Sequence, residues 1–495
     1  MNLRLVATLA LFPSLVACSS STEDAIPAGN GGGMVPASAG GGGSGQAGSG
    51  GGVVTNGGAG GGAGKGGTTA GGGGSGGTAG GGTSAGAGGP ASGGGSGGTG
   101  NVSHLFGSHS HPYAAGSIAP SGGAAALDQA TASFYDAWKA KYLVAGCGTG
   151  RYYVNVGADA GGGKSSASIT VSEGHGYGMV ITALMAGHDP DAQKEFDGLY
   201  SFFRDHPSVN SKDLMAWNQV TGCGDDPNGG NDAATDGDLD IAFGLLLADR
   251  QWGSAGKIDY AGEGKKVIAA ILAHEVSAAT HLTLLGDWAM PSDTKYYDST
   301  RSSDWMVDHF RAFGKASGDA AWTAVVDTHL GLAKTMQDQF SPKTGLLPDF
   351  IVGTAGSPAP APSKFLEDVT DGAYGYNACR TPWRLGADWL VSGDARSQAA
   401  VMRMNDWVRT KTSGDPSKID DGYKLDGTNV TTAIDNNMSF VAPFAVAAMA
   451  DAAHPQWLDA LWKRMLASTV ASDDYYGNSI KMLSMLVVSN NYWMP

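Results

Sequence analysis

Apolar residues recur at helical spacing through most of the chain after Ala125. In the first such stretch, Leu127, Phe134, Trp138 and Tyr142 lie near one helix face. The same spacing recurs at about 174–187, 191–204, 236–251, 259–276, 302–316, 319–338, 376–393, 395–411, 436–452, 455–468 and 473–489. The pattern predicts twelve helices, broken by Gly, Pro and Asp-rich loops, with few strands, and hence an all-α domain. It does not by itself choose between a bundle and a solenoid.

Residues 31–100 have a different composition. More than half are glycine, most of the rest are Ser, Thr and Ala, and charge is almost absent. Such a segment cannot bury enough apolar surface to offset its conformational entropy, so we expect a disordered flexible tether. The lack of a strict G-x-y period excludes a collagen-like array. We therefore predict a linker over residues 19–122 and one folded domain over residues 123–495.

The first residues read as a secretory signal. A charged start is followed by an apolar run too short to span a membrane. Its end, Leu15-Val16-Ala17-Cys18, resembles the bacterial lipobox, which implies a signal peptide over residues 1–18 and lipidation of Cys18. Ser19 is not the aspartate that retains such proteins at the inner membrane. We expect a cell-envelope protein, anchored to the outer membrane or cell surface, with simple secretion as the alternative.

The formal net charge of -15 lies in the folded part of the chain. An acidic domain is a poor nucleic-acid binder and suits a cationic polymer, although surface solubility explains the charge equally well. Cys147, Cys223 and Cys379 allow at most one disulfide, and their pairing stays open. The histidines 104, 109 and 111 precede the domain, where we expect a solvated linker. We predict no metal site, no cofactor and a monomer.

Two acidic segments stand out as candidate chemistry. Glu173 lies where a polar β-branched run gives way to a helix, among glycines that we expect to leave room for a ligand. Asp236, Asp238 and Asp240 crowd the start of another helix. One aspartate there is explained by capping, but three repel each other more than capping requires, which indicates a functional site.

The segments Ser172-Glu173-Gly174-His175-Gly176-Tyr177-Gly178-Met179 and Ala234-Thr235-Asp236-Gly237-Asp238 resemble two motifs of glycoside hydrolase family 8. The resemblance covers most of residues 126–489 and departs at Gly244, where the family usually has Ser or Ala. It implies an (α/α)6 barrel, with inner and outer rings of six helices. It also implies an inverting, endo-acting hydrolase with Glu173 as the general acid and Asp236 as the carboxylate that contacts the sugar at the cleavage point.

The general base needs a separate assignment. Many family members carry an aspartate in a Y-D-A-x-R-x-P-W-R motif, where this chain has Asn377. An amide cannot take the proton. A branch that includes chitosanases and mixed-linkage glucanases takes its base from a preceding loop, which is present here at 357–371. The resemblance favours Glu367, with Asp368 and Asp371 as alternatives, and implies that Arg380 is an active-site arginine.

Several side chains are candidates for substrate binding. Trp217, Trp288 and Tyr476 lie at segment boundaries, where sugar rings could stack on them, whereas Trp383 is expected in the core. The segment 300–306 also looks like the chitosanase and glucanase branch, and Asp304 in it is a candidate amine contact.

We therefore expect an enzyme that cleaves β-1,4 bonds of a polysaccharide, with chitosan the first choice of substrate. The alternatives are β-1,3-1,4-glucan or cellulose. A non-catalytic surface lipoprotein that binds glycans is the alternative from another class.

Overall fold

The computed structural model describes residues 102–158, 168–430 and 435–495, all of which belong to one compact unit. The expected signal peptide, Cys18 and the glycine-rich segment 31–100 lie outside the described residues. No helix in the described ranges is both long and apolar enough to cross a membrane.

The described residues form thirteen α-helices, one of which, α6 (Thr294–Tyr297), is a single turn. Each of the other twelve matches one predicted stretch: α1 (Ala124–Tyr142), α2 (Ser172–Leu184), α3 (Ala192–Asp205), α4 (Thr235–Trp252), α5 (Tyr260–His274), α7 (Val307–Ser317), α8 (Ala321–Gln339), α9 (Thr381–Ser392), α10 (Ala395–Lys411), α11 (Met438–Ala448), α12 (Pro455–Ala467) and α13 (Tyr475–Val488). The largest differences are at α7 and α9, which begin at Val307 and Thr381 rather than near 302 and 376. Residues 302–304 and 378–380 form short 3-10 helices ahead of them, and Pro382 favours a start at the first turn of α9.

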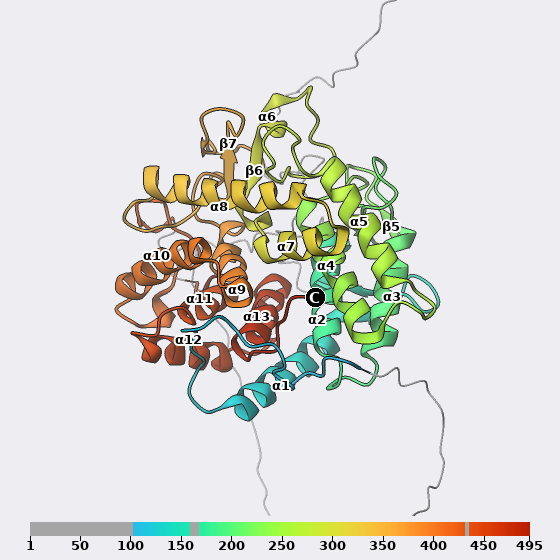
Figure 1. Ribbon diagram of the computed structural model, residues 1–495, viewed down its shortest axis with the longest axis horizontal. Coiled ribbons are helices and arrows are strands. Elements are labelled where there is room, and N and C mark those ends of the chain that lie inside the picture. The colour runs from blue at the N-terminus through green and yellow to red at the C-terminus, as the bar shows by residue number, and fades with distance from the viewer. Residues whose placement is uncertain (1–101, 159–167, 431–434) are drawn as a thin grey trace, which may run out of the picture. The chain divides into compact units, whose positions relative to one another are not determined.

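The twelve long helices form two rings. The helices α2, α4, α7, α9, α11 and α13 contact one another in that order, and α13 closes the ring on α2 (Figure 1). The first five each pack outward against the next helix of the chain, and α13 packs outward against α1. This confirms the (α/α)6 barrel. Because outer and inner helices alternate along the chain, the inner helices run in one direction and their N-termini gather at one end.

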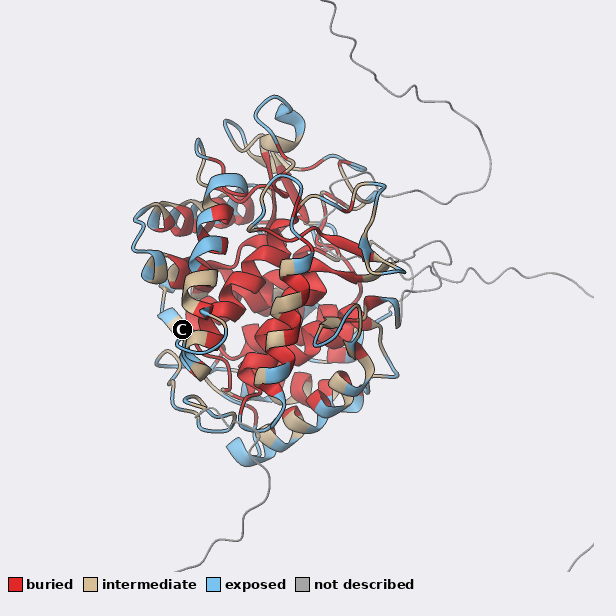
Figure 2. Cartoon of the chain, turned by 90° about the vertical axis from the view of Figure 1, so that its right-hand side faces the viewer, coloured by how far each residue is buried: buried red, intermediate tan, exposed pale blue. Residues whose placement is uncertain are grey.

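Burial separates the two rings. Every residue of α2, α11 and α13 is buried, whereas an outer helix such as α3 buries one face only (Figure 2). Inner helices therefore offer their N-terminal turns, rather than a polar side, for chemistry. Outer helices supply the polar surface of the domain.

Glycines let α2 and α4 cross closely. A Cβ on Gly176 would lie 2.7 Å from the Cβ of Asp240, and one on Gly244 would lie 3.0 Å from that of Met179. The departure from the family pattern at Gly244 thus suits the tight crossing. The expectation that glycines near Glu173 leave room for a ligand is wrong. The space at Gly174 is filled by the Tyr475 hydroxyl, 2.5 Å from where a Cβ would stand.

Short antiparallel ladders attach to the barrel. They are β1 (Leu143–Ala145) with β2 (Tyr152–Val154); β3 (Ser168–Val171), β4 (Asn218–Val220) and β5 (Gly224–Asp225); and β6 (Ser299–Arg301), β7 (Phe350–Val352) and β8 (Ala359–Pro360). Strand β3 runs directly into α2, and β6 leads towards α7. The ladders therefore fix where these two inner helices begin.

The chain enters the domain earlier than predicted. The N–H of Phe106 donates to the carbonyl of Ala186 (2.8 Å), and the N–H of Ile118 donates to that of Met449 (2.9 Å). Both carbonyls lie just beyond the C-termini of inner helices. The predicted boundary at residue 123 is thus too late, because Phe106, Tyr113 and Ile118 pack against the core.

The cysteines resolve into one pair and one thiol. Cys147 and Cys223 form a disulfide with their Cα atoms 5.5 Å apart, which ties the β1–β2 turn to the β4–β5 turn. Cys379 is a buried free thiol. The allowance of at most one disulfide within the domain is confirmed.

Candidate active site

Glu173 and Asp236 meet at the N-terminal end of the barrel. Each lies in the first turn of its inner helix, α2 and α4 respectively. Nη1 of Arg380 donates to Oε2 of Glu173 at 2.7 Å and to Oδ2 of Asp236 at 3.0 Å. The Tyr475 hydroxyl donates to Oε1 of Glu173 at 3.2 Å. One buried guanidinium therefore links the two carboxylates that the sequence motifs single out.

The environment of Glu173 favours its protonated form. Burial raises the pKa of this carboxyl to about 8. The charge of Arg380 opposes the rise, and repulsion from Asp236 adds to it. Glu173 therefore holds a proton at neutral pH and can give it up to a more basic partner.

Asn377 connects this cluster to Glu367. The amide Nδ2 donates to Oε2 of Glu367 at 2.7 Å, and Oδ1 accepts from Nη2 of Arg380 at 3.0 Å. Because an arginine can only donate, the amide has one consistent orientation. A hydrogen-bonded chain thus runs from Glu173 through Arg380 and Asn377 to Glu367.

The loop that carries Glu367 is held by its own contacts. Asp371 accepts from the N–H groups of Leu366 (2.7 Å), Glu367 (3.0 Å) and Asp368 (2.7 Å). Phe365 packs into a small second apolar cluster, whose other buried members are Leu285, Phe350 and Ala361. The Asp371 carboxylate therefore stabilises the conformation of the loop through these three hydrogen bonds.

Of the three acids considered for the base, only Glu367 reaches the cluster. Asp368 is exposed and accepts from the N–H of Val369. The Glu367 side chain keeps 14% of its surface exposed, whereas the side chains of Glu173 and Asp236 keep none. Burial raises the pKa of Glu367 to about 7, while the nearby Arg301 and the bond from Asn377 act to lower it.

Arg301 is an unforeseen member of the site. Its side chain is 1% exposed, and Nε lies 3.2 Å from Oδ2 of Asp304. Its Nη2 lies 3.8 Å from Asp236, and Nη1 lies 3.6 Å from Glu367. The only sequence signal was its place in the 300–306 segment. Contrary to expectation, the Asp304 carboxylate is buried and bonded to Arg301 and Ser303, so it presents no surface to a substrate amine.

The aromatic candidates lie in different settings. Trp217 is 8% exposed, and its indole N–H donates to the carbonyl of Gly229 at 2.8 Å. Trp288 is half-buried and meets Tyr296 edge-on, with ring centres 5.2 Å apart. Trp383 is buried, as expected, under the guanidinium of Arg384.

Tyr475 and Tyr476 have separate contacts at the start of α13. The Tyr476 hydroxyl donates to the carbonyl of Tyr376, and the Arg380 guanidinium lies 5.7 Å from the Tyr476 ring centre. Tyr475 is the tyrosine that bonds to Glu173. Tyr476 therefore supports Arg380, and its neighbour Tyr475, also at the segment boundary, is the one that reaches Glu173.

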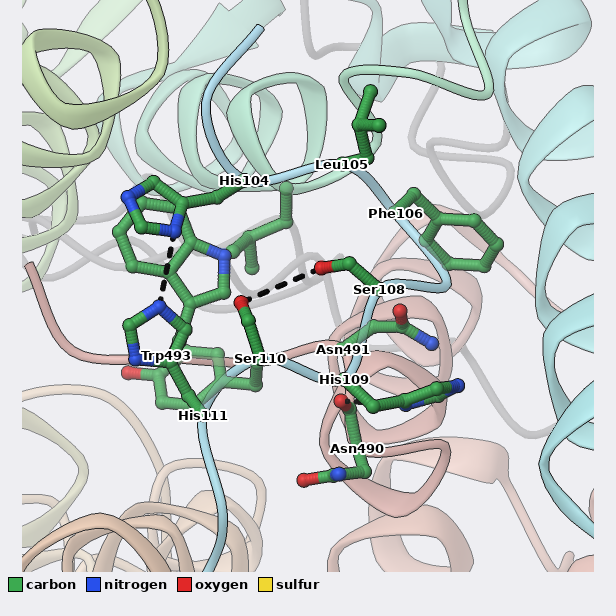
Figure 3. A pocket seen from close by; sticks show the side chains of 12 residues that line it. His104, Leu105, Phe106, Ser108, His109, Ser110, His111, Asn490, Asn491 and Trp493 are labelled. Carbon is green, nitrogen blue, oxygen red and sulfur yellow. Dashed lines mark hydrogen bonds between the residues drawn. The ribbon is translucent and has the colours of Figure 1, made fainter.

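A small pocket lies at the other end of the barrel. Residues 104–111 and 490–493 supply most of its lining, and Nε2 of His111 lies 3.0 Å from Nδ1 of His104, beside Trp493 (Figure 3). His109 bonds to Asp128 at 2.9 Å. These histidines belong to the fold, so the expectation of a solvated linker is wrong, and the pocket is distant from the acids.

One group in the described ranges has the spacing of metal ligands: Asp406, Asp451 and His454. Arg409 already lies 3.3 Å from Asp406 and 3.5 Å from Asp451. The group sits between α10 and the turn before α12, apart from the acids of the candidate site.

The cluster defines a class of enzyme. Hydrolysis of a glycosidic bond by inversion requires a protonated carboxyl for the leaving oxygen and a second carboxylate to activate water. Glu173 and Glu367 are two carboxyls with raised pKa values, joined by a hydrogen-bonded chain at one end of a helical barrel. The fold and the site are those of a glycoside hydrolase.

Comparison with known proteins places the chain more closely. The family model described as Glycosyl hydrolases family 8 matches residues 119–490, and the chain belongs to this family. It is 44% identical over 382 residues to a "Beta-glucanase" of Niallia circulans, a match that covers 77% of this chain and 89% of the relative. An "Endoglucanase" of Bacillus sp. (strain KSM-330) is 40% identical over 377 residues, covering 74% and 77% of the two chains.

A solved structure is also similar to this chain. The apo structure of a β-1,3-1,4-glucanase from Paenibacillus sp. X4 superposes with a TM-score of 0.73 at 42% identity. The match covers 80% of this chain and all of the solved one. The protein is thus an endo-acting glycoside hydrolase of family 8.

Proposed function

We propose that this protein cleaves β-1,3-1,4-glucan with inversion of configuration. The activities named for its relatives are those of glucanases, and the solved structure described above is a β-1,3-1,4-glucanase. The expectation of chitosan finds no support among these relatives, and Asp304 is already paired with Arg301. Because the relative from Bacillus sp. (strain KSM-330) is named an endoglucanase, cellulose is the second candidate.

The hydrogen-bonded chain from Glu173 to Glu367 carries the proposal. Glu173 donates its proton to the leaving glycosidic oxygen, while Glu367 accepts a proton from the water that attacks the anomeric carbon. Asp236 contacts the sugar between them. An inverting pair needs about 6.5 to 9.5 Å between its carboxyl groups to admit that water. Two side chains, Arg380 and Asn377, separate the carboxylates here.

Asn377 positions the side chain of the proposed base, Glu367. Its amide cannot take a proton, but it donates to one oxygen of Glu367 and leaves the other free. A loop glutamate held by an asparagine thereby replaces an aspartate on the helix as the base.

We also propose that a lipid on Cys18 anchors the protein to the bacterial envelope. The lipobox-like Leu15-Val16-Ala17-Cys18 supports this. Acyl chains on one cysteine would hold the protein stably at a membrane surface. Mass spectrometry of the mature N-terminal peptide tests it. Release of a Cys18→Ala variant into the medium is the expected result, and an unmodified Cys18 would contradict the anchor.

Reducing-end release from four polymers side by side tests the enzymatic proposal. We expect β-1,3-1,4-glucan to lead carboxymethyl cellulose, with little release from chitosan or xylan. NMR of early products should show α-anomers. A β-anomer would exclude inversion, and activity led by chitosan would overturn the substrate. Binding without release from any polymer would indicate a glycan-binding protein.

A further inference from the structure

Arg301 is a buried cation whose terminal nitrogens lie near the carboxylates of Asp236 and Glu367 but lack hydrogen-bond partners among the described residues. Both Nη1 and Nη2 are buried and make no hydrogen bond with any described residue. The same holds for Oε1 of Glu367. A buried polar group without a partner costs roughly 1 to 3 kcal/mol, more when it is charged. Three such atoms at one place therefore indicate a bound polar species.

The spacing of these atoms fits a single water. Nη1 of Arg301 lies 3.6 Å from Oε1 of Glu367, too far for a direct hydrogen bond. A water about 2.8 Å from each would complete the triangle and satisfy both. The other Glu367 oxygen is already held by Asn377. Only Oε1 is free to face a water.

We propose that Arg301 and Glu367 together hold the attacking water, with Arg301 as a positioning residue. This rests on the proposed function. Nη1 donates to one lone pair of the water, and the water donates one hydrogen to Oε1 of Glu367. The second lone pair forms the new bond to the anomeric carbon. As that bond forms, the glycosidic C–O bond breaks, its oxygen takes the proton of Glu173, and Glu367 takes a proton from the water.

Asp304 explains how Arg301 keeps this orientation. It accepts from Nε and is itself fixed by Ser303, so the Nη end of the guanidinium is directed away from it. Burial alone would lower the pKa of Arg301, but the carboxylates of Asp304, Asp236 and Glu367 raise it. Arg301 is therefore charged throughout the working pH range.

The same charge acts on the base. Glu367 faces Arg301 and Arg380, which favour its anion, and also Asp371, whose charge opposes it. Asp349 also interacts with Glu367, but burial raises the pKa of Asp349 well above its usual range and favours its neutral form. Removal of the Arg301 charge should therefore raise the pKa of Glu367 and delay its ionisation to higher pH. The pH at which Glu367 ionises therefore tests the proposal, because loss of an arginine with a purely structural role would not change it.

The test compares kcat and its pH profile on β-1,3-1,4-glucan for the wild type, Arg301→Met and Arg301→Lys. We expect Arg301→Met to lower kcat about 100-fold with little change in KM, and to move the acidic limb up by about one pH unit. Arg301→Lys should leave the acidic limb at the pH of the wild type, and its kcat should lie between those of Arg301→Met and the wild type. An unmoved limb in Arg301→Met, or a loss confined to KM, would overturn the proposal.

Two control variants distinguish failure of the proposed water site from failure of the assignment of Glu367 as the base. Arg311→Met removes a half-buried arginine of α7 that pairs with Asp388 and Asp394, so it should change stability but not the acidic limb. Normal activity in Glu367→Gln would overturn the base assignment itself. If Glu367→Gln is inactive and Arg301→Met keeps its limb, only the water site fails.

A measurement without variants covers the case in which Arg301→Met does not fold. A high-resolution crystal structure of the wild-type protein should show a water within hydrogen-bond distance of Nη1 of Arg301 and Oε1 of Glu367. A direct bond between these two atoms, with no water, would overturn the proposal.

Discussion

The two halves of the candidate site are built in different ways. Glu173 and Asp236 stand on inner helices whose residues form the main core, and their side chains have no exposed surface. Glu367 stands on a loop between β8 and α9, held by Asp371 and by a separate small apolar cluster. The acid side is thus as rigid as the barrel, whereas the base side depends on a few local contacts.

This difference suits the two roles proposed for Glu173 and Glu367. A general acid must keep a proton at neutral pH, and deep burial achieves this by disfavouring the anion. A general base must meet a fresh water in each cycle, and a partly exposed loop gives access. We expect changes on the acid side to act through chemistry and stability together, and changes on the base side to alter activity alone.

Glu173→Gln should have the largest effect on activity. Loss of the proton donor should lower kcat on the polymer by about 10³ to 10⁴-fold, while the amide oxygen still accepts from Arg380. Aryl glycosides with a good leaving group need no proton, so they should lose far less. Equal losses on both substrates would remove Glu173 from the role of acid.

Glu367→Gln should come next, with a fall in kcat of about 10² to 10³-fold on both kinds of substrate. Because the Glu367 side chain is partly exposed, a small anion such as azide should reach this side and restore turnover by attacking in place of water. The matched variant Asp368→Asn, on the same loop but exposed, should retain activity. Activity that depended on Asp368 instead would move the base to that residue.

The pH profile of kcat/KM tests both halves at once. Glu367 must be ionised, so activity should fall as pH drops below about 7, and Glu173 must be protonated, so activity should fall as pH rises above about 8. We expect a bell with its optimum between these values and about a tenfold loss per unit beyond each limb. Glu367→Gln should remove the acidic limb from any residual activity. An optimum near pH 5 would contradict both assignments.

Asp371→Asn should loosen the base loop without harming the barrel. The three N–H groups that donate to Asp371 would lose a charged acceptor, and we expect kcat to fall about tenfold. The melting temperature should change by less than about 2 °C, because the loop lies outside the main core. A large loss of stability with unchanged kcat would contradict the separation of the two halves.

Cys147→Ser should have the smallest effect on rate. The disulfide joins turns on the acid side, and its loss should lower the free energy of unfolding by about 2 to 4 kcal/mol. The kcat value should stay within about twofold of the wild type. Cys223→Ser and the double variant should behave alike, and additive losses would argue against the bond.

The helices and the acids could be predicted because their signals are local. All twelve stretches followed from apolar spacing, and Glu173, Asp236, Glu367 and Arg380 followed from short motifs. Arg301 and Tyr475 could not be found in this way, since their roles depend on residues far along the chain. The prediction that the glycines of α2 leave room for a ligand failed for the same reason, because side chains from distant parts of the chain fill the space beside them.

The N-terminal segment and the acids lie at opposite ends of the barrel. It crosses the barrel at the C-terminal ends of the inner helices, where Ser103 bonds to Gln251 and Phe106 to Ala186. The acids lie at the opposite end. The side on which the chain enters the domain is therefore opposite to the side that carries Glu173, Asp236 and Glu367, so the entering chain leaves the candidate site unobstructed.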